Sequence, residues 1–589
     1  MEMTGAQILM QALKDEGVDT LFGFPGGAVI DIYDELAQTD LRHVLVRHEQ
    51  GAVHAADGYA RASGKVGVCL VTSGPGATNT VTGIASAHAD SIPIVILTGQ
   101  VPTHLIGNDA FQEVDIVGIT RPCTKHNYLV KSTADLARIV REAFYLARSG
   151  RPGPVLVDIP KDVARGRAVY KPPGEVHLRS YNPTYQPHRK QLREVARLIE
   201  DAQRPVIFAG GGVILSNGAE ALTRLARRTR IPVTTSLMGL GAFPGSDPLF
   251  LGMIGMHGTY AANMSTGACD LLLAVGVRFD DRVTGKTDIF ASQAKIVHID
   301  IDPTSIRKNV MVSIPVVGDC RISLQLLDEM VEDVQLGDLA SRREPWLERI
   351  ADWKRSQPLS YQPGTAIKPQ YVIEQLHTLT QGEAIITTEV GQNQMWAAQY
   401  YLFNHPNHFI TSGGLGTMGF GLPAAIGAQI ACPGKTVVDI AGDGSIQMNI
   451  QEMATAVQYG LPIKIAILNN GYLGMVRQWQ ELFYGRRYSA TRMDYAPDFV
   501  KLAEAYGAVG LRATKPSEVE GVIRAALATD RPVVMDFIVS PAEKVSPMVP
   551  AGATLSEILE LEWCDEAQSC HLEKIYAEGR REVYGSEGY

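Results

Sequence analysis

Two segments of the sequence decide the fold and carry much of the chemistry. Residues 437–445 read VVDIAGDGS, an apolar run that ends in Gly442-Asp443-Gly444, and residues 463–470 read IKIAILNN, an apolar run that ends in two asparagines. Short apolar runs closed by turn residues predict two buried parallel strands with a helix between them. Because the carboxyl ends of neighbouring parallel strands face one crevice, we expect Asp443 and Asn470 to share one hard cation.

Mg²⁺ is the cation that suits this pair, because it takes one or two protein oxygens together with waters and phosphate oxygens. The turn formed by Gly442, Asp443, Gly444 and Ser445 lets backbone N–H groups at a helix start approach a diphosphate. An Asp-Gly pair alone is most often a plain turn. The motif is informative because Asn470 ends the next strand along the chain.

Length and composition indicate a multidomain globular protein. A chain of 589 residues is too long for one hydrophobic core. With 54 basic and 63 acidic residues the formal net charge is −9, and we predict no nucleic-acid partner. The sequence has no apolar run long enough to span a membrane. Its seven cysteines are scattered without metal-ligand spacing, which favours a reduced compartment, the cytoplasm.

The first and last thirds of the chain look like two copies of one domain. The strand entered by Gly64-Lys65 and the strand entered by Gly434-Lys435 both end in a polar residue followed by glycine, at an offset of about 370 residues. Strand-like runs alternate with helical patterns throughout, which predicts an α/β fold of three parallel-sheet domains. We expect them at residues 1–170, 190–340 and 365–545, followed by a C-terminal tail at 546–589.

The Asp443 and Asn470 pair resembles the cofactor motif of the thiamine-diphosphate-dependent enzyme superfamily. The resemblance implies a third Mg²⁺ ligand, the backbone carbonyl of Tyr472. It also implies a pyrimidine-binding and a diphosphate-binding domain of like fold, which would account for the internal repeat. In such enzymes a glutamate of the pyrimidine domain hydrogen-bonds the aminopyrimidine ring and helps the cofactor lose its C2 proton. Residues 47–52, RHEQGA, match that motif at Glu49, for which a capping or surface role is the plainer alternative.

Within the superfamily, residues 4–552 are most similar to acetohydroxyacid synthase large subunits. The segments that carry this similarity include FPGGA at 24–28, GNDAFQE at 107–113, TSGGLGTMG at 411–419 and GMVRQW at 474–479. The resemblance implies decarboxylation of pyruvate and condensation of the two-carbon fragment with pyruvate or 2-ketobutyrate, in branched-chain amino acid biosynthesis. It also implies thiamine diphosphate, Mg²⁺ and FAD as cofactors, a homodimer or homotetramer with shared active sites, and a separate regulatory small subunit.

The resemblance implies further site residues. The Gly27 N–H would stabilise a developing oxyanion, while Phe111, Gln112 and Lys161 would line the approach from the neighbouring subunit. Trp479 would gate the second keto acid, whose carboxylate would meet Arg282. Met418 would lie beneath the cofactor, and the Gly416 carbonyl would accept a hydrogen bond from its exocyclic amine. Additional cofactor-binding residues in the third domain would be Val390, Gly391, Gln392 and Met475. The FAD-binding residues would be Arg151, Gly210, Gly211, Gly212, Met256, His257, Gly276, Arg278, Asp280, Asp300 and Asp319.

Several of these residues have plainer interpretations. Phe111 and Trp479 could be core aromatics, Lys161 a solvated helix start, and Met418 a packing residue. The three glycines from 210 to 212 could form a bare tight turn, and Arg282 could belong to a surface ion pair with Asp281.

Two positions depart from the family pattern. Glu389 and Asn393 stand where the family commonly has Asp and His. Other flavin-containing thiamine enzymes, such as pyruvate oxidase or glyoxylate carboligase, are the nearest alternatives, although Glu49 speaks against the carboligase. A non-catalytic dinucleotide-binding protein on the same scaffold is a further alternative.

Overall fold

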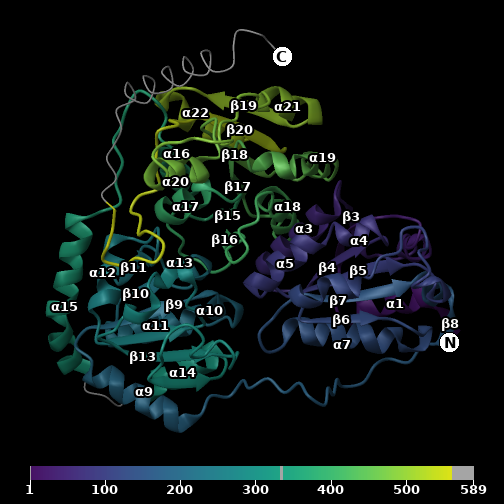
Figure 1. The fold of residues 1–589 in the computed structure, drawn as a ribbon, viewed down its shortest axis with the longest axis horizontal. Coiled ribbons are helices and arrows are strands. Elements are labelled where there is room, and N and C mark those ends of the chain that lie inside the picture. Colours follow the sequence, from purple (N-terminus) through teal and green to yellow (C-terminus); the bar gives the residue numbers. More distant parts are fainter. Residues whose placement is uncertain (1, 332–335, 560–589) are drawn as a thin grey trace.

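The structure, a computed structural model, describes residues 2–331 and 336–559 (Figure 1). Three domains are present, and each is built on a six-stranded sheet in which all strands run parallel. The predicted α/β fold of three parallel-sheet domains is therefore confirmed. The first domain lies to the right in Figure 1, the middle domain at the lower left and the third domain at the top.

The first domain has the strand order β3-β2-β4-β5-β7-β6. A small antiparallel pair, β1 (Glu2–Thr4) with β8 (Arg167–Val169), lies outside this sheet. The strands of the six-stranded sheet in the first domain are β2 (Thr20–Phe24), β3 (Arg42–Leu45), β4 (Gly67–Val71), β5 (Ile94–Gln100), β6 (His126–Leu129) and β7 (Val155–Pro160). Its helices are α1 (Gly5–Asp15), α2 (Ile30–Leu36), α3 (Glu49–Ser63), α4 (Pro75–Thr78), α5 (Val81–Asp90), α6 (Ile116–Thr120), α7 (Leu136–Arg148) and α8 (Lys161–Arg165).

The third domain repeats this topology. Its order is β16-β15-β17-β18-β20-β19, which is the order of the first sheet when the strands of each domain are counted from its own start. The predicted internal repeat is thus present as two sheets of one connectivity. The strands are β15 (Ile385–Thr388), β16 (Phe409–Ile410), β17 (Val437–Gly442), β18 (Lys464–Asn469), β19 (Val509–Ala513) and β20 (Val533–Ile538). The helices are α16 (Pro369–Thr380), α17 (Gln392–Tyr400), α18 (Gly421–Ala431), α19 (Met453–Gln458), α20 (Gly474–Phe483), α21 (Phe499–Tyr506) and α22 (Pro516–Leu527).

The middle domain has a different order, β11-β10-β9-β12-β13-β14. Counted from its own start this is 3-2-1-4-5-6, the order typical of dinucleotide-binding domains, whose ligand crevice lies between the first and fourth strands. The strands are β9 (Pro205–Ala209), β10 (Val233–Thr235), β11 (Phe250–Met253), β12 (Leu271–Val275), β13 (Lys295–Asp300) and β14 (Ile314–Val317). The helices are α9 (Arg189–Asp201), α10 (Gly211–Leu215), α11 (Ala219–Thr229), α12 (Tyr260–Ala268), α13 (Asp281–Thr284), α14 (Cys320–Met330) and α15 (Leu336–Ser356).

Equivalent helices of the two repeated domains, α3 and α18, pack against each other. A Cβ on Gly58 would lie 2.2 Å from the carbonyl oxygen of Ala424, and a Cβ on Gly427 would lie 1.9 Å from that of Ala55. Gly58 corresponds to Gly427 in the repeat, and Ala55 corresponds to Ala424, so each domain makes the same contact with the other. The first and third domains therefore face each other about an internal pseudo-two-fold axis. Only glycine permits backbones to approach this closely. The buried core is continuous across the interface.

Two expectations concern the chain as a whole. In the part that the structure describes, no helix is both long and apolar enough to cross a membrane. The five described cysteines are all free thiols, whereas Cys564 and Cys570 lie outside the described residues, as does the predicted tail beyond residue 559.

Candidate active site

The predicted cation pair lies at the carboxyl edge of the third sheet. Asp443 directly follows β17, and Asn470 directly follows the neighbouring strand β18. Asp443 is buried, and among the described residues its Oδ2 has no hydrogen-bond partner. Burial raises the pKa of the Asp443 carboxyl to about 6, although backbone N–H groups, including that of Asn470, oppose this shift. A buried carboxylate oxygen that faces no donor fits a bound cation, and the all-oxygen donor set fits Mg²⁺.

The segment after β18 is held against the start of α17. The Tyr472 N–H donates to Asn470 Oδ1 at 3.0 Å, and Asn470 Nδ2 donates to Gln392 Oε1 at 3.2 Å. A Cβ on Gly474 would lie 2.1 Å from Gln392 Oε1, so a larger residue would separate the two segments. The structure thus brings the three predicted metal ligands and Gln392 to one edge of the sheet.

The sequence predicts one helix after Asp443, but the turn there does not lead into a continuous helix. Two 3₁₀ turns, η6 (Ile446–Met448) and η7 (Ile450–Glu452), precede α19. Asn449 separates them at φ −134°, and its side-chain amide donates to the Gly419 carbonyl at 2.6 Å. Asn449 therefore interrupts the helix with a non-helical backbone conformation, and its side chain contacts a residue 30 positions earlier in the chain.

Five predicted residues of the first domain lie at the carboxyl edge of the first sheet. They follow four different strands, in the arrangement expected for a site built on an open parallel sheet. They are Gly27 after β2, Glu49 after β3, Phe111 and Gln112 after β5, and Lys161 after β7.

Direct contacts connect some of these residues. Lys161 Nζ donates to the Gly27 carbonyl at 2.9 Å, so the lysine that begins α8 holds the glycine loop. Asn79 Nδ2 donates to Glu49 Oε2 at 2.9 Å, and Glu49 is the first residue of α3. Phe111 is 88% exposed, which excludes the alternative of a core aromatic.

A cavity of about 1270 Å³ lies between the three domains. Most of the residues predicted to bind FAD and the second keto acid line this cavity. Inside it, the Arg282 guanidinium carbon lies 5.9 Å from the ring centre of Trp479. Arg282 also forms the ion pair with Asp281 at 3.6 Å, so this alternative holds together with the contact to Trp479. The predicted residues that line the cavity are Arg151, Gly211, Gly212, Met256, His257, Gly276, Arg278, Asp280, Arg282, Asp300, Asp319, Val390, Gly391, Gly416, Met475 and Trp479.

The glycines of the middle domain lie where its first and fourth strands, β9 and β12, end. A Cβ on Gly210 would lie 2.3 Å from the carbonyl oxygen of Gly276, and a Cβ on Gly212 would lie 2.6 Å from Gly276 Cα. The turns after β9 and β12 therefore touch backbone to backbone, as the close strand-end packing of a dinucleotide site requires. Burial lowers the pKa of His257, also in the cavity wall, to about 4.

Comparison with known proteins agrees with this geometry. Three family models match: the N-terminal TPP binding domain of thiamine pyrophosphate enzymes at residues 3–119, the central domain at 192–327 and the C-terminal TPP binding domain at 389–537. The acetolactate synthase large subunit of Haemophilus influenzae is 49% identical over 95% of this chain and 98% of its own length. The isozyme 3 large subunit of Escherichia coli is 51% identical over 95% and 99%, respectively. A probable acetolactate synthase large subunit of Methanocaldococcus jannaschii is 50% identical over 95% of each chain.

The chain belongs to the acetolactate synthase large-subunit family. It is a thiamine-diphosphate-dependent enzyme, and the relatives give no support to the oxidase, carboligase or non-catalytic alternatives.

Within one chain of this family member, one group of predicted site residues lies outside the lining of the large cavity. Among the described residues that line the large cavity, none belongs to the group on the first sheet. That group is Gly27, Glu49, Phe111, Gln112 and Lys161.

The two departures from the family pattern have structural roles in the third domain of this enzyme. Glu389 accepts the Gly419 N–H at 2.6 Å and the Leu422 N–H at 3.2 Å, at the start of α18. Burial raises the pKa of Glu389, while these N–H groups oppose the shift. Asn393 Nδ2 donates to the Glu389 carbonyl at 3.0 Å and to the Ile440 carbonyl at 2.9 Å. Together they join β15, β17 and α18 at the carboxyl edge of the third sheet.

Sequence reasoning missed Glu452, which holds the start of α3. Its Oε1 accepts the N–H groups of Arg47 and His48, both at 3.0 Å, and Thr455 Oγ1 donates to its Oε2 at 2.7 Å. A third-domain carboxylate therefore fixes the two residues that precede Glu49. No local pattern marks this role of Glu452, because Arg47 and His48 lie in another domain.

Proposed function

We propose that this chain forms 2-acetolactate from two molecules of pyruvate, with release of carbon dioxide, and 2-aceto-2-hydroxybutyrate from pyruvate and 2-ketobutyrate. The observation that carries the proposal is the Asp443 and Asn470 edge in a chain 51% identical to an acetolactate synthase over nearly its full length. Membership of the family supplies the activity, and this edge supplies the cofactor site.

We assign the metal site to Asp443, Asn470 and the Tyr472 carbonyl, with the diphosphate at the glycine turn and beside Gln392. When bound, thiamine diphosphate supplies the carbon acid and the electron-accepting ring that decarboxylation of a 2-keto acid requires. Val390, Gly391 and Met475 would complete its binding surface. The orphaned Oδ2 of Asp443 supports the presence of Mg²⁺.

Glu49 has the role of a hydrogen-bond donor to the cofactor's pyrimidine ring. Asn79 binds one oxygen of this carboxyl group, which fixes the orientation of the other oxygen for a contact with the cofactor. Arg282 and Trp479 form the acceptor subsite. The guanidinium can bind a carboxylate through two parallel hydrogen bonds, while the indole excludes water and limits the size of the acceptor.

FAD is the occupant we propose for the large cavity. The 3-2-1-4-5-6 strand order, the glycines at the crevice and the volume of about 1270 Å³ support a dinucleotide. The net reaction transfers no electrons to an external acceptor, so the flavin would be structural.

We further propose a dimer, or a tetramer built from dimers, in which the first-domain group of one chain completes the third-domain site of another. The exposure of Phe111 and the absence of this group from the described cavity lining support the proposal. It can be tested by mixing two inactive variants, Glu49→Gln and Asp443→Ala. If sites are shared, random mixed dimers regain one intact site each, and about a quarter of the activity returns. No recovery would contradict sharing. A separate regulatory small subunit and a cytoplasmic location stay predictions.

The activity is tested by supplying the purified chain with pyruvate, thiamine diphosphate, Mg²⁺ and FAD, and following acetolactate and oxygen in one vessel. Acetolactate without oxygen uptake is the expected result. Oxygen uptake with acetate or acetyl phosphate would overturn the assignment and indicate an oxidase.

A further inference from the structure

The loop after β16 is rich in glycine, so its backbone has many accessible conformations, yet a cofactor contact requires one of them. Residues 411–419 read TSGGLGTMG and contain four glycines, which lose more conformational freedom on ordering than any other residue. Ser412, Gly413, Gly414 and Gly416 line the large cavity. The proposed cofactor contacts, the Gly416 carbonyl and Met418, belong to this loop. Something outside the loop must therefore fix its shape.

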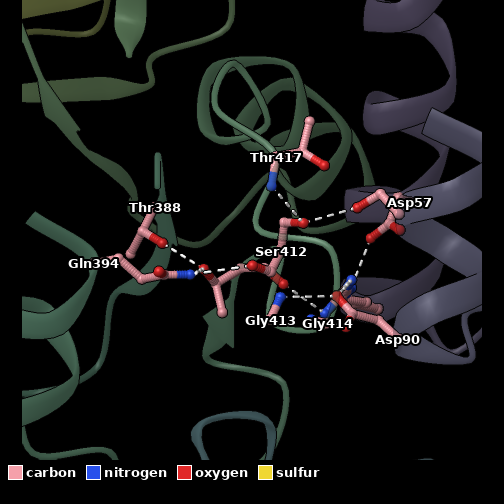
Figure 2. A network of polar contacts seen from close by, with 11 residues as sticks. Asp57, Asp90, Thr388, Gln394, Ser412, Gly413, Gly414 and Thr417 are labelled. Atoms are coloured by element: carbon pink, nitrogen blue, oxygen red, sulfur yellow. Dashed lines mark hydrogen bonds and ion pairs between the residues drawn. The ribbon is translucent and has the colours of Figure 1, made fainter. Parts of the chain in front are cut away.

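Asp90, the last residue of α5 in the first domain of the same chain, makes that connection. Its Oδ2 accepts the Gly413 N–H at 3.0 Å, and its Oδ1 accepts the Gly414 N–H at 2.7 Å (Figure 2). Each carboxylate oxygen thus takes one backbone donor of the loop. The Asp90 side chain is fully buried, where such charge-assisted hydrogen bonds are strong.

Arg61 fixes Asp90 in turn. Its guanidinium donates to Asp90 Oδ2 at 3.0 Å, to Asp57 Oδ1 at 2.6 Å and to the Thr411 carbonyl at 3.0 Å. One planar side chain therefore holds both the carboxylate and the first residue of the loop. Ser86, on the same helix as Asp90, adds a hydroxyl contact to Ser412 at 2.9 Å.

The loop is also tied to its own domain. Ser412 Oγ accepts the Thr417 N–H at 3.0 Å, which closes the loop on itself just before Met418. Gln394 Nε2 donates to Thr411 Oγ1 at 2.7 Å and to the Ser412 carbonyl at 3.2 Å. Figure 2 shows the loop held between these residues of the third domain and the two helices of the first. A shift of Asp90 would move Gly413 and Gly414 and, through the closed loop, Gly416 and its neighbours.

Helix α3 carries both Glu49 and Arg61. Glu49 is its first residue, and Arg61 lies about 18 Å further along the helix axis. In the shared-site assembly proposed above, Glu49 serves the cofactor held by another chain, whereas Arg61 acts on the loop of its own chain. One rigid helix would then belong to two active sites.

We propose that Asp90, fixed by Arg61, is a positioning residue for thiamine diphosphate in its own chain, and that it acts by setting the conformation of the loop at residues 411–418. The proposal rests on the proposed function and on the cofactor contacts that the family resemblance implies for Gly416 and Met418. It gives the first domain of each chain a part in both active sites.

The test compares Asp90→Asn with a matched control, Asp270→Asn, in the full-length chain saturated with thiamine diphosphate, Mg²⁺ and FAD. Asp270 is a carboxylate that also accepts two backbone N–H groups, those of Gln203 and Arg204 at 3.0 Å, but in the middle domain. The readout is the rate of deuterium exchange at C2 of the bound cofactor, measured by NMR after acid quench. Thermal stability and flavin content are measured on the same samples.

The expected result is exchange slowed about tenfold or more in Asp90→Asn, because an amide turns one acceptor into a donor that faces a backbone N–H or Arg61. Asp270→Asn should lose stability but exchange at the normal rate. A rate in Asp90→Asn equal to that of the unmodified enzyme overturns the proposal.

Met418→Ala separates failure of the inference from failure of the assigned loop function. Slow exchange in Met418→Ala together with normal exchange in Asp90→Asn leaves the loop function intact and overturns the inference alone. Normal exchange in Met418→Ala shows that Met418 does not act on the cofactor, and it overturns both the loop function and the proposal that Asp90 acts through the loop, whatever the rate in Asp90→Asn. If Asp90→Asn does not fold, Arg61→Lys decides, because it keeps a positive charge beside Asp90 but removes the guanidinium that contacts both Asp90 and the Thr411 carbonyl. A reduction of about threefold is expected there, and an unchanged rate overturns the proposal.

Discussion

Replacing Glu452 by glutamine would test whether the third domain sets the position of Glu49. Glu452 is fully buried and accepts three donors: the N–H groups of Arg47 and His48 and the hydroxyl of Thr455. A hydrogen bond to a charged group contributes about 1.5–3 kcal/mol, and a glutamine offers one acceptor oxygen instead of two. Burial of the charged carboxylate has a desolvation cost, which raises the pKa of Glu452, and the neutral amide of glutamine avoids part of this cost. We expect a net loss of about 2–4 kcal/mol in the free energy of unfolding.

The effect on catalysis should exceed the effect on stability. The two backbone donors immediately precede Glu49, and a displacement of about 1 Å of a positioned group can cost about 100-fold in rate. We therefore expect kcat to fall about 10- to 100-fold at saturating cofactor, with C2 deuterium exchange slowed by the same factor. The assays are acetolactate formation, C2 exchange and thermal unfolding.

Glu518→Gln is the matched control for this experiment. Glu518 accepts the N–H groups of Thr514 at 2.8 Å and Lys515 at 3.2 Å at the start of α22, on the surface of the same domain. It repeats the chemistry of Glu452 without proximity to Glu49. If Glu452→Gln keeps kcat and the exchange rate within about twofold of the control, Glu452 serves only stability and the reasoning is refuted.

Three other perturbations have defined outcomes. Asp443→Ala should raise the Kd for thiamine diphosphate in the presence of Mg²⁺ by at least about tenfold, as measured by titration calorimetry, and should leave the flavin content unchanged. Unchanged affinity would exclude Asp443 as a ligand. Burial lowers the pKa of His54 to about 3, so below pH 6.5 the unfolded chain binds a proton that the folded chain refuses, and stability is lost as pH falls. Between pH 7 and pH 4, the free energy of unfolding of His54→Phe should therefore fall by about 3 kcal/mol less than that of the unmodified protein, as measured by urea unfolding. Parallel pH profiles of the two proteins would contradict this. Gly212→Ala places a Cβ 2.6 Å from Gly276 Cα and should abolish most bound flavin, seen as lost flavin absorbance; full flavin content would rule out the proposed crevice.

Much of the fold follows from local pattern. The apolar runs at 437–441 and 463–468 became β17 and β18, and the repeat offset became two sheets of one strand order. These features are readable because strand period and turn chemistry depend on near neighbours. The same reasoning placed Asp443 and Asn470 at one sheet edge, because the carboxyl ends of adjacent parallel strands must meet there.

The sequence left other features open. It gave no sign that α3 and α18 would meet through Gly58 and Gly427, or that the helix expected after Asp443 would start as 3₁₀ turns. It also could not decide whether Phe111 was a core aromatic, which its exposure settled.

The sequence by itself determined the α/β class, the repeat, the cofactor motif and the family. Tertiary structure alone brought Glu452 to the residues before Glu49, and Asp90 to the loop of Gly413 and Gly414. These partners are separated by 405 and 323 residues along the chain. A buried carboxylate that pairs with backbone N–H groups leaves no side-chain signature on its partner, and its partner is fixed only when two domains pack together.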